Sequence, residues 1–416
     1  MAEVSRQATS GPPIVNVEDQ QGGGLLQRIR AALGGRHVRD RLAAVERAVK
    51  KLGDAERDRT TSLEARLGGI ARTLGEQPTA KDLRELRQAL RGGAAQQQPD
   101  RQLFEALDQM AKSGRPILIG PWIGEVGFEL LYWIPFVQWV RANWQLAPER
   151  EVIVSRGGVE SWYRRDGADY LDALGFVSPD EFRLSVGEEK RKHRRPVAFD
   201  DRLTKAVVQH RSLGEIDILH PGLMYRTFAP YWSDEAGYAR IDQFTRYRLL
   251  ERSANAFPSE LPKEYVAVRF YFSESFPDTA QNREFAHGVV SSLAERTPVV
   301  VLNPGVNVDE HSDWMPDESD RIITIACGAA PERNLAVQSA VVAGARAFVG
   351  TYGGLSHLAP LYQLPAVGFY STQTFKLHHV YAAQRAFRAI GAGAFTLIDV
   401  AQADVVERAL GSLVAQ

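Results

Sequence analysis

The chain has 416 residues, 44% of them hydrophobic, which is enough material for two or three domains with buried cores. Its 50 Lys and Arg residues nearly balance 51 Asp and Glu residues, so bulk charge does not indicate a nucleic-acid-binding protein. The single cysteine, Cys327, excludes an intrachain disulfide and a Cys-rich zinc site. Residues 1–24 lack the apolar core of a signal peptide, and no long apolar run occurs, which predicts a cytoplasmic protein.

The first hundred residues differ in composition from the rest. Residues 1–24 are polar and contain Gly and Pro, so we expect them to be disordered. Residues 25–112 are expected to be helical and to end in a linker that begins at Gly92. Apolar residues with the 4-3-4-3 spacing of a coiled-coil seam are Val38, Leu42, Val45, Val49 and Leu52. This segment either joins copies of the chain into a homo-oligomer or packs as amphipathic helices on the rest of the molecule.

From residue 113 onward, short apolar runs alternate with helical patterns. Strands are predicted at Pro116–Gly120, Glu151–Ser155, Ile216–Leu219, Tyr265–Phe270, Val299–Leu302, Ile322–Ile325, Ala347–Val349 and Ala366–Phe369. Helices are predicted at Glu125–Ala142, Tyr170–Leu174 and Val405–Val414. Such alternation is typical of parallel sheets in α/β proteins. We therefore predict two Rossmann-like domains, residues 113–258 and 259–416, facing a cleft at the carboxyl ends of their strands.

A glycine-rich turn follows the predicted strand that ends at Val349. Two adjacent glycines let backbone approach a ligand closely, and the free N–H groups of a helix start favour an anion. The same turn also has a purely structural interpretation. As a donor-binding site it would comprise Thr351, Tyr352, Gly353, Gly354, Leu355, Ser356 and His357.

The first strand of the first domain leads to Glu125, which lies between Gly124 and Gly127. A carboxylate at the mouth of a cleft can act as a general base toward a hydroxyl group. Alternatively, Glu125 only complements the dipole of the helix that follows. Glu129, one turn into that helix, is the second candidate for the base.

Two further segments of the first domain carry polar or aromatic side chains. Arg156 stands beside two glycines and is followed by Trp162 and Tyr163, which indicates either an acceptor site or a packed turn. Gly124 and Gly127 would complete the acceptor side. The basic run Lys190–Arg195 is either solvated surface or a contact for an anionic acceptor or for lipid headgroups at the inner face of the membrane.

In the second domain, Arg269 closes a predicted strand. An arginine there can bind a diphosphate and offset leaving-group charge, although a structural ion pair is the competing interpretation. Asn303 follows the next strand and is expected to frame a nucleoside. Asp309, Glu310, His311 and Asp313 do not share one face of a helix or strand, so neither a metal site nor another cofactor is expected.

Two of these motifs together resemble those of a known enzyme group. The turn Thr351–Ala359, followed by the strand Leu364–Tyr370, is similar to the donor region of bacterial glycosyltransferases of the GT-B fold, especially the heptosyltransferase-like group (glycosyltransferase family 9). Gly124–Glu125 resembles the first loop of that group, whose carboxylate is the usual catalytic base. The resemblance spans roughly residues 115–400. Thr351–Tyr352 stands where the group has Asp-Ser, so the resemblance does not specify an ADP-heptose donor.

The resemblance implies transfer of a sugar from a nucleotide-activated donor to a glycan, lipid-linked or protein acceptor, with inversion and without a required metal. It also implies a last helix that crosses back to the first domain. Two alternatives keep the architecture: a nucleotide-sugar 2-epimerase and a polysaccharide pyruvyl transferase. A third alternative is a non-catalytic coiled-coil assembly protein that carries a nucleotide-sugar-sensing module.

Overall fold

The computed structural model describes residues 100–188, 196–252, 261–303, 305, 311–317, 319–326 and 330–414. The chain divides into two units, Met1–Gly92 and Gly93–Gln416, and all described residues belong to the second unit. The predicted disorder over residues 1–24, the predicted coiled coil over residues 25–91 and the basic run Lys190–Arg195 lie outside the described residues. The predicted domain boundary at residue 258 falls within the undescribed range 253–260.

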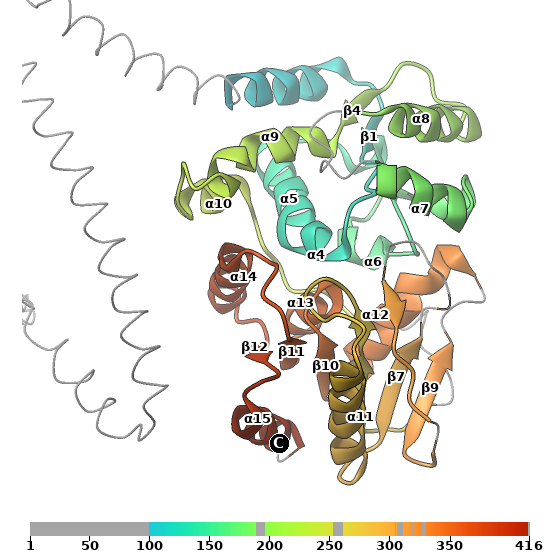
Figure 1. The fold of residues 1–416 in the computed structure, drawn as a ribbon. Helices are drawn as coiled ribbons and strands as arrows, with labels where there is room; N and C mark the ends of the chain where they lie inside the picture. The colour runs from blue at the N-terminus through green and yellow to red at the C-terminus, as the bar shows by residue number, and fades with distance from the viewer. Residues whose placement is uncertain are drawn as a thin grey trace, which may run out of the picture. The chain divides into compact units, whose positions relative to one another are not determined.

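The first sheet has four parallel strands in the order β3-β2-β1-β4. Its strands are β1 (Ile117–Ile119), β2 (Glu151–Ser155), β3 (Asp169–Asp172) and β4 (Asp217–Leu219). Its helices are residues 100–113, α4 (Val126–Phe128), α5 (Ile134–Asn143), α6 (Glu160–Tyr163), α7 (Pro179–Glu188), α8 (Ala198–His210), α9 (Pro221–Trp232) and α10 (Ala239–Phe244). Every residue of β1 and β2 is buried, as continuous apolar runs in a parallel sheet require. We call this sheet and its helices the first lobe (Figure 1).

The predicted long helix after β1 is confirmed, with one irregularity. α4 continues through the π-helical turn Glu129–Trp133 into α5, so the helical run extends from Val126 to Asn143. All five residues of the π-helical turn are buried. π-Helical turns often occur at functional sites, and this one holds Glu129.

The predicted helix at Tyr170–Leu174 is wrong. Residues Asp169–Asp172 form β3, which pairs in parallel with β2, and a 3₁₀ turn follows at Ala173–Gly175. Pairing with a buried neighbouring strand overrides local preference here. The Asp172 carboxylate then accepts a hydrogen bond from the backbone N–H of Leu174, which begins the 3₁₀ turn.

The second sheet has six parallel strands in the order β12-β11-β10-β5-β7-β9. Its strands are β5 (Val266–Arg269), β7 (Val299–Asn303), β9 (Ile322–Ala326), β10 (Ala347–Thr351), β11 (Ala366–Tyr370) and β12 (Phe395–Asp399), and a short antiparallel pair is formed by β6 (Tyr271–Phe272) and β8 (Ser312–Asp313). Its helices are α11 (Ala280–Ala294), α12 (Asn334–Gly344), α13 (Gly354–Leu361), α14 (Leu377–Ala389) and α15 (Ala403–Val414). We call this sheet and its helices the second lobe.

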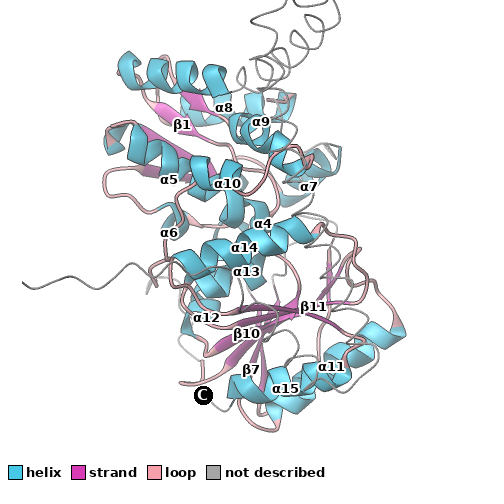
Figure 2. Cartoon of the chain, turned by 90° about the vertical axis from the view of Figure 1, so that its left-hand side faces the viewer, coloured by secondary structure: helices cyan, strands magenta, loops and turns pink. Residues whose placement is uncertain are grey.

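The last helix does not cross back to the first lobe, so that expectation is wrong. α15 buries Val406, Leu410 and Leu413 in the core of the second sheet and lies beside α11 in both views (Figures 1 and 2). Its apolar face matches that sheet, which fixes the helix there.

The helix that bridges the lobes is α14. Arg385 forms an ion pair with Asp242 of α10 at 2.6 Å, and Lys376 Nζ donates to the carbonyl of Trp232 at the end of α9. In Figure 2, α14 lies between the sheets with α10 and α4 on one side and α13 on the other.

The predicted fold class is confirmed for the described residues by the topology of the chain itself. Two parallel Rossmann-like sheets, each flanked by helices, face one another, which is the GT-B arrangement. The loops after β1 and β10 meet between the sheets. Ligands in such folds bind at the carboxyl ends of the strands.

Candidate functional site

A cleft of about 780 Å³ lies between the lobes, where β1, β2, β5 and β10 end. It brings together ten residues that the sequence singled out: Gly124, Glu125, Gly127, Arg156, Arg269, Tyr352, Gly353, Gly354, Leu355 and His357. Tyr132, Phe182, Arg183, Tyr271, Lys376 and His379 also line it. Most of the predicted site is therefore assembled in one place.

Two helix starts meet in this cleft. A Cβ added to Gly354, the first residue of α13, would lie 2.6 Å from Val126 Cγ1 and 3.1 Å from the Gly127 nitrogen of α4. A Cβ on Gly353 would collide with the Tyr271 hydroxyl. Gly353 has extended backbone, with φ 169°, and Gly354 has no positive φ. Close packing between the lobes therefore explains the glycine at position 354.

Because both helices begin here, the partial positive charges of two helix starts point into one cleft. α13 is eight residues long, and α4 continues into α5. In the first turn of α13, the Ser356 N–H donates to the Gly353 carbonyl at 3.1 Å, which leaves the N–H groups of Gly354 and Leu355 available to an oxyanion.

His357 lies one turn into α13, at the wall of the cleft. It is only 4% exposed, and neither ring nitrogen has a hydrogen-bond partner among the described residues. Its ring packs edge-on against Tyr352 and Phe395. Burial lowers the pKa of His357 to about 4. The imidazole is therefore neutral at physiological pH, so His357 contributes an N–H donor and no positive charge.

Glu125 is exposed and occupies the N-cap position of α4. Its carboxylate makes no capping hydrogen bond, and no ion pair joins it to another described residue. The side chain faces the cleft near Tyr225 and Tyr352: burial, followed by the charge of Glu125, raises the pKa of both phenols. A partnerless carboxylate at the mouth of the cleft has the access that a general base needs.

Glu129 is completely buried and does not line the cleft. Its Oε1 accepts hydrogen bonds from Ser155 Oγ and the Tyr163 hydroxyl, both at 2.5 Å. Burial raises its pKa to about 7, against the lowering effect of Arg156, whose Nη1 lies 3.6 Å from Glu129 Oε2. As the second candidate for the base, Glu129 lacks access to a substrate hydroxyl.

Arg269 forms a structural ion pair, one of the two interpretations that the sequence left open. Its Nε donates to Asp313 Oδ1 at 2.9 Å, and its Nη1 donates to Gln338 Oε1 at 3.2 Å. The structural ion pair therefore exists, and the guanidinium still borders the cleft.

Four predicted site residues lie outside the cleft lining. Trp162 is fully buried in the core, so the predicted acceptor contact is wrong. The Thr351 hydroxyl accepts from the Tyr271 N–H and donates to the Tyr271 carbonyl, and the Ser356 hydroxyl is bonded to the backbone of Gly353. Both hydroxyl groups therefore form hydrogen bonds with the backbone of the protein and do not line the cleft. Asn303 accepts a hydrogen bond from the Gly305 N–H.

Sequence reasoning missed the bridge formed by Tyr132 and His379. The Tyr132 hydroxyl lies 2.6 Å from His379 Nδ1, and both side chains line the cleft. The available signal was the density of aromatic residues that follow Glu129 along one helix. Their contact with a residue 247 positions away has no signature in the sequence.

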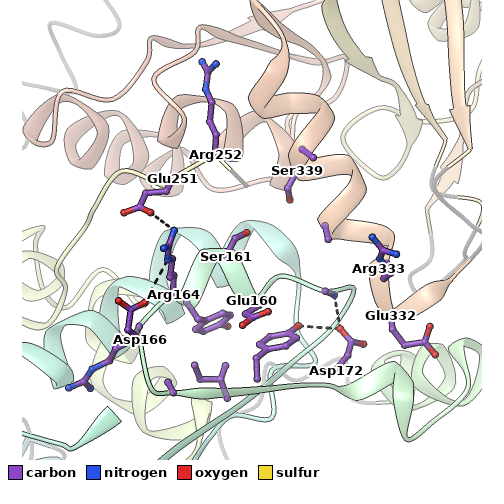
Figure 3. A pocket seen from close by; sticks show the side chains of 18 of the residues that line it. Glu160, Ser161, Arg164, Asp166, Asp172, Glu251, Arg252, Glu332, Arg333 and Ser339 are labelled. Atoms are coloured by element: carbon purple, nitrogen blue, oxygen red, sulfur yellow. Dashed lines mark hydrogen bonds and ion pairs between the residues drawn. The ribbon is translucent and has the colours of Figure 1, made fainter. Parts of the chain in front are cut away.

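A second cavity of about 870 Å³ lies between α6, β3 and the start of α12 (Figure 3). Some of its charged side chains are bonded: Arg164 pairs with Glu251 at 2.6 Å, and Asp172 accepts from Tyr170 and from the Gly158 N–H. The cleft at Glu125 instead gathers ten of the residues that the sequence singled out, which makes it the better candidate site.

Among the described residues, no group of three or more His, Cys, Asp or Glu side chains is arranged to hold a metal ion. Within the same residues, no helix is both long enough and apolar enough to span a membrane.

No protein-family model matches the chain, and no curated protein matches its sequence. Solved structures with a similar arrangement exist at low similarity. The iron-containing dodecameric glycosyltransferase TibC of enterotoxigenic E. coli is 12% identical, with a TM-score of 0.38, over 72% of this chain and 76% of TibC.

Two further solved structures have similarly low identity and TM-scores. A family 9 glycosyl transferase from Veillonella parvula is 11% identical, with a TM-score of 0.38, over 72% of this chain and 97% of its own. A protein from Listeria monocytogenes, described as a UDP-N-acetylglucosamine 2-epimerase, is 11% identical, with a TM-score of 0.33, over 72% and 88% of the two chains. At these similarities, only the chain's own residues bear on what it does.

Proposed function

We propose that this protein is a glycosyltransferase that moves a sugar from a nucleotide-activated donor to an acceptor hydroxyl. The observation that carries the proposal is the convergence, in one cleft between two Rossmann-like lobes, of a partnerless carboxylate with the start of α13. A base and an oxyanion site on opposite lobes are the two parts that direct displacement at a sugar carbon requires.

The donor diphosphate would bind at the start of α13. The first-turn N–H groups of Gly354 and Leu355, the neutral N–H of His357 and the Arg269 guanidinium supply the donors. The hydroxyl groups of Thr351 and Ser356 are already bonded to backbone and would act only by shaping the turn.

In the reaction, Glu125 would accept the proton of the acceptor hydroxyl as its oxygen attacks the anomeric carbon. The bond between that carbon and the donor phosphate oxygen breaks, and the nucleoside diphosphate leaves with the bonding electrons. The α13 start and Arg269 stabilise the charge that develops on the leaving phosphate. A single displacement inverts the anomeric centre, and Gly124, Gly127 and Arg156 would border the acceptor.

The test is a thermal-shift screen of nucleotide sugars, followed by turnover of the best binder with and without added acceptors. A glycosyltransferase transfers the sugar only when an acceptor is present. EDTA should leave this activity unchanged, because Arg269 and the start of α13 stabilise the negative charge of the diphosphate without a metal ion. Conversion of the donor alone would identify a 2-epimerase. Transfer of a pyruvyl group would identify a pyruvyl transferase, and binding without any turnover would identify a sensing module.

Residues 25–91 would join copies of the enzyme into an oligomer on the cytoplasmic side of the membrane. Light scattering on a chain that lacks residues 1–95 tests this. Fewer copies per particle than in the full chain support the proposal, and an unchanged number of copies contradicts it.

A further inference from the structure

Two arginines of the first lobe are matched in burial and differ in bonding. The side chains of Arg141 and Arg156 are each 6% exposed, and each faces a glutamate whose side chain is 0% exposed. Arg141 donates twice to Glu151 Oε2, at 3.0 and 2.7 Å, and once to the carbonyl of Tyr163. Burying a guanidinium is costly, and these bonds compensate for the cost.

Arg156 has no such compensation. Among the described residues, its buried Nε and Nη1 have no hydrogen-bond partner, and neither has the facing Glu129 Oε2, 3.6 Å from Nη1. The guanidinium carbon lies 5.5 Å from the centre of the Phe182 ring, and the side chain borders the cleft. A buried charged donor without a partner in the protein indicates that a ligand supplies the partner.

The carboxylate behind Arg156 is held in place. Ser155 Oγ and the Tyr163 hydroxyl both donate to Glu129 Oε1, so Oε2 is the oxygen that faces the guanidinium. Glu129 sits in the π-helical turn, and Ser155 ends β2. The carboxylate therefore fixes Arg156 from behind without saturating its donors.

Arg156 and Arg269 also approach the same helix. The residue after Arg156, Gly157, packs against Leu335, where an added Cβ would lie 2.9 Å from the Leu335 side chain. Arg269 donates to Gln338, which is three residues further along α12. Residues three apart on a helix are surface neighbours, so the backbone after Arg156 and the Arg269 guanidinium contact neighbouring positions of α12, and both arginine side chains border the cleft from opposite lobes.

We propose that Arg156 binds a substrate oxyanion, a phosphate or carboxylate, and that Glu129 is the positioning residue that holds it there. The site rests on the proposed function only for the source of the oxyanion, which is either the donor diphosphate or an anionic group on the acceptor. In both cases the planar fork of Arg156 closes over the anion from the first lobe while Arg269 faces it from the second.

The experiment measures binding of inorganic pyrophosphate by calorimetry to the full chain and to Arg156→Gln, with Arg141→Gln as the matched control. We expect Arg156→Gln to bind pyrophosphate about 10- to 100-fold more weakly, the range for lost hydrogen bonds to a charged group. Its melting temperature should fall less than that of Arg141→Gln, because it loses the 3.6 Å ion pair with Glu129 but no hydrogen bond to the described residues. Arg141→Gln should melt at a lower temperature and bind pyrophosphate normally.

A second titration separates the two sources. Glucose 6-phosphate is added to protein saturated with pyrophosphate: a loss in Arg156→Gln at this step, with pyrophosphate binding intact, assigns Arg156 to an acceptor oxyanion. Normal binding of both probes by Arg156→Gln, or binding of neither by the wild type at millimolar concentration, overturns the proposal. Because calorimetry needs no turnover, a chain that fails to transfer sugar still reports on this site.

The positioning role is tested by a double-mutant cycle. Glu129→Gln should weaken binding of the same probe several-fold, and it should add nothing in an Arg156→Gln background, because Glu129 acts only through Arg156. Glu151→Gln, which alters the fully buried glutamate that pairs with Arg141, should leave binding unchanged. A loss in Glu129→Gln that adds fully to that of Arg156→Gln would contradict the role.

Discussion

Gly127 and Gly354 face each other where the two lobes meet. A Cβ on Gly354 would lie 3.1 Å from the Gly127 nitrogen, and a Cβ on Gly127 would lie 3.7 Å from the Gly354 Cα and 3.4 Å from His357 Nδ1. The two helix starts approach this closely because Gly354 carries no side chain, whereas a Cβ on Gly127 would make ordinary van der Waals contact. The glycine at position 354 therefore holds the starts of α4 and α13 in contact.

Gly354→Val is therefore expected to push the lobes apart. Its side chain would overlap Val126, so we expect a lower melting temperature and weaker binding of pyrophosphate at the α13 start. Calorimetry and thermal unfolding measure both. Gly288→Ala is the control, because Gly288 is exposed on α11 with no atom within 4 Å of an added Cβ, and alanine favours a helix. Normal binding by Gly354→Val would show that the turn does not shape the anion site.

Glu125→Gln should lower kcat by about 10²–10⁴ with little change in melting temperature or nucleotide affinity. The amide keeps the size of the side chain but cannot accept the hydroxyl proton. The carboxylate makes no bond that stabilises the fold. Steady-state kinetics with saturating donor measures the effect, and Glu160→Gln, outside the cleft, serves as the control. Near-normal turnover would exclude Glu125 as the base.

His357 should make the protein less stable as the pH falls. Its folded pKa of about 4 lies below the ordinary value of 6.5, so its contribution is complete above pH 6.5 and is lost as the pH falls toward 4. His357→Gln removes this titration. The difference in unfolding free energy between wild type and variant should therefore change across this window, as urea unfolding at several pH values measures. A constant difference would mean that His357 is not desolvated.

Glu129 should have the opposite dependence. Burial raises its folded pKa from 4.5 to about 7, so its contribution is complete below pH 4.5 and is lost as the pH rises through 7. Glu129→Gln cannot ionise. Its unfolding free energy relative to the wild type should increase between pH 4.5 and 7 and then level off. If urea unfolding gives a difference that falls with pH instead, the carboxylate is ionised throughout and fully paired with Arg156.

Much of the fold could be predicted because buried parallel strands are continuous apolar runs, and these stand out between helical patterns. Glu125 and Gly353–Gly354 were recognisable for a related reason, since both follow strand ends, where ligands bind. Thr351 and Trp162 also lie at or just after strand ends, yet their side chains are buried in the protein and do not line the cleft. The Thr351 hydroxyl bonds to the backbone of Tyr271, 80 residues earlier, and only the three-dimensional structure reveals that partner.

For strand β3 and Arg156 too, the deciding contacts come from residues that are distant in the sequence. β3 forms because a neighbouring strand is available, not because of its own residues. The sequence allowed Arg156 in either an acceptor site or a packed turn, but nothing local indicated that the buried Glu129, on the helical run before β2, would lie 3.6 Å from it.

The bridging position of α14 has a consequence for how the protein is made. Phe128 and Tyr132 pack against His379, and the hydrogen bond between Tyr132 and His379 spans 247 residues. During synthesis, the first lobe leaves the ribosome long before α14, which packs against it, has been made. Until α14 arrives, that aromatic surface is open to water and to other nascent chains, so a chain stopped before residue 376 should aggregate even though it contains a complete first sheet.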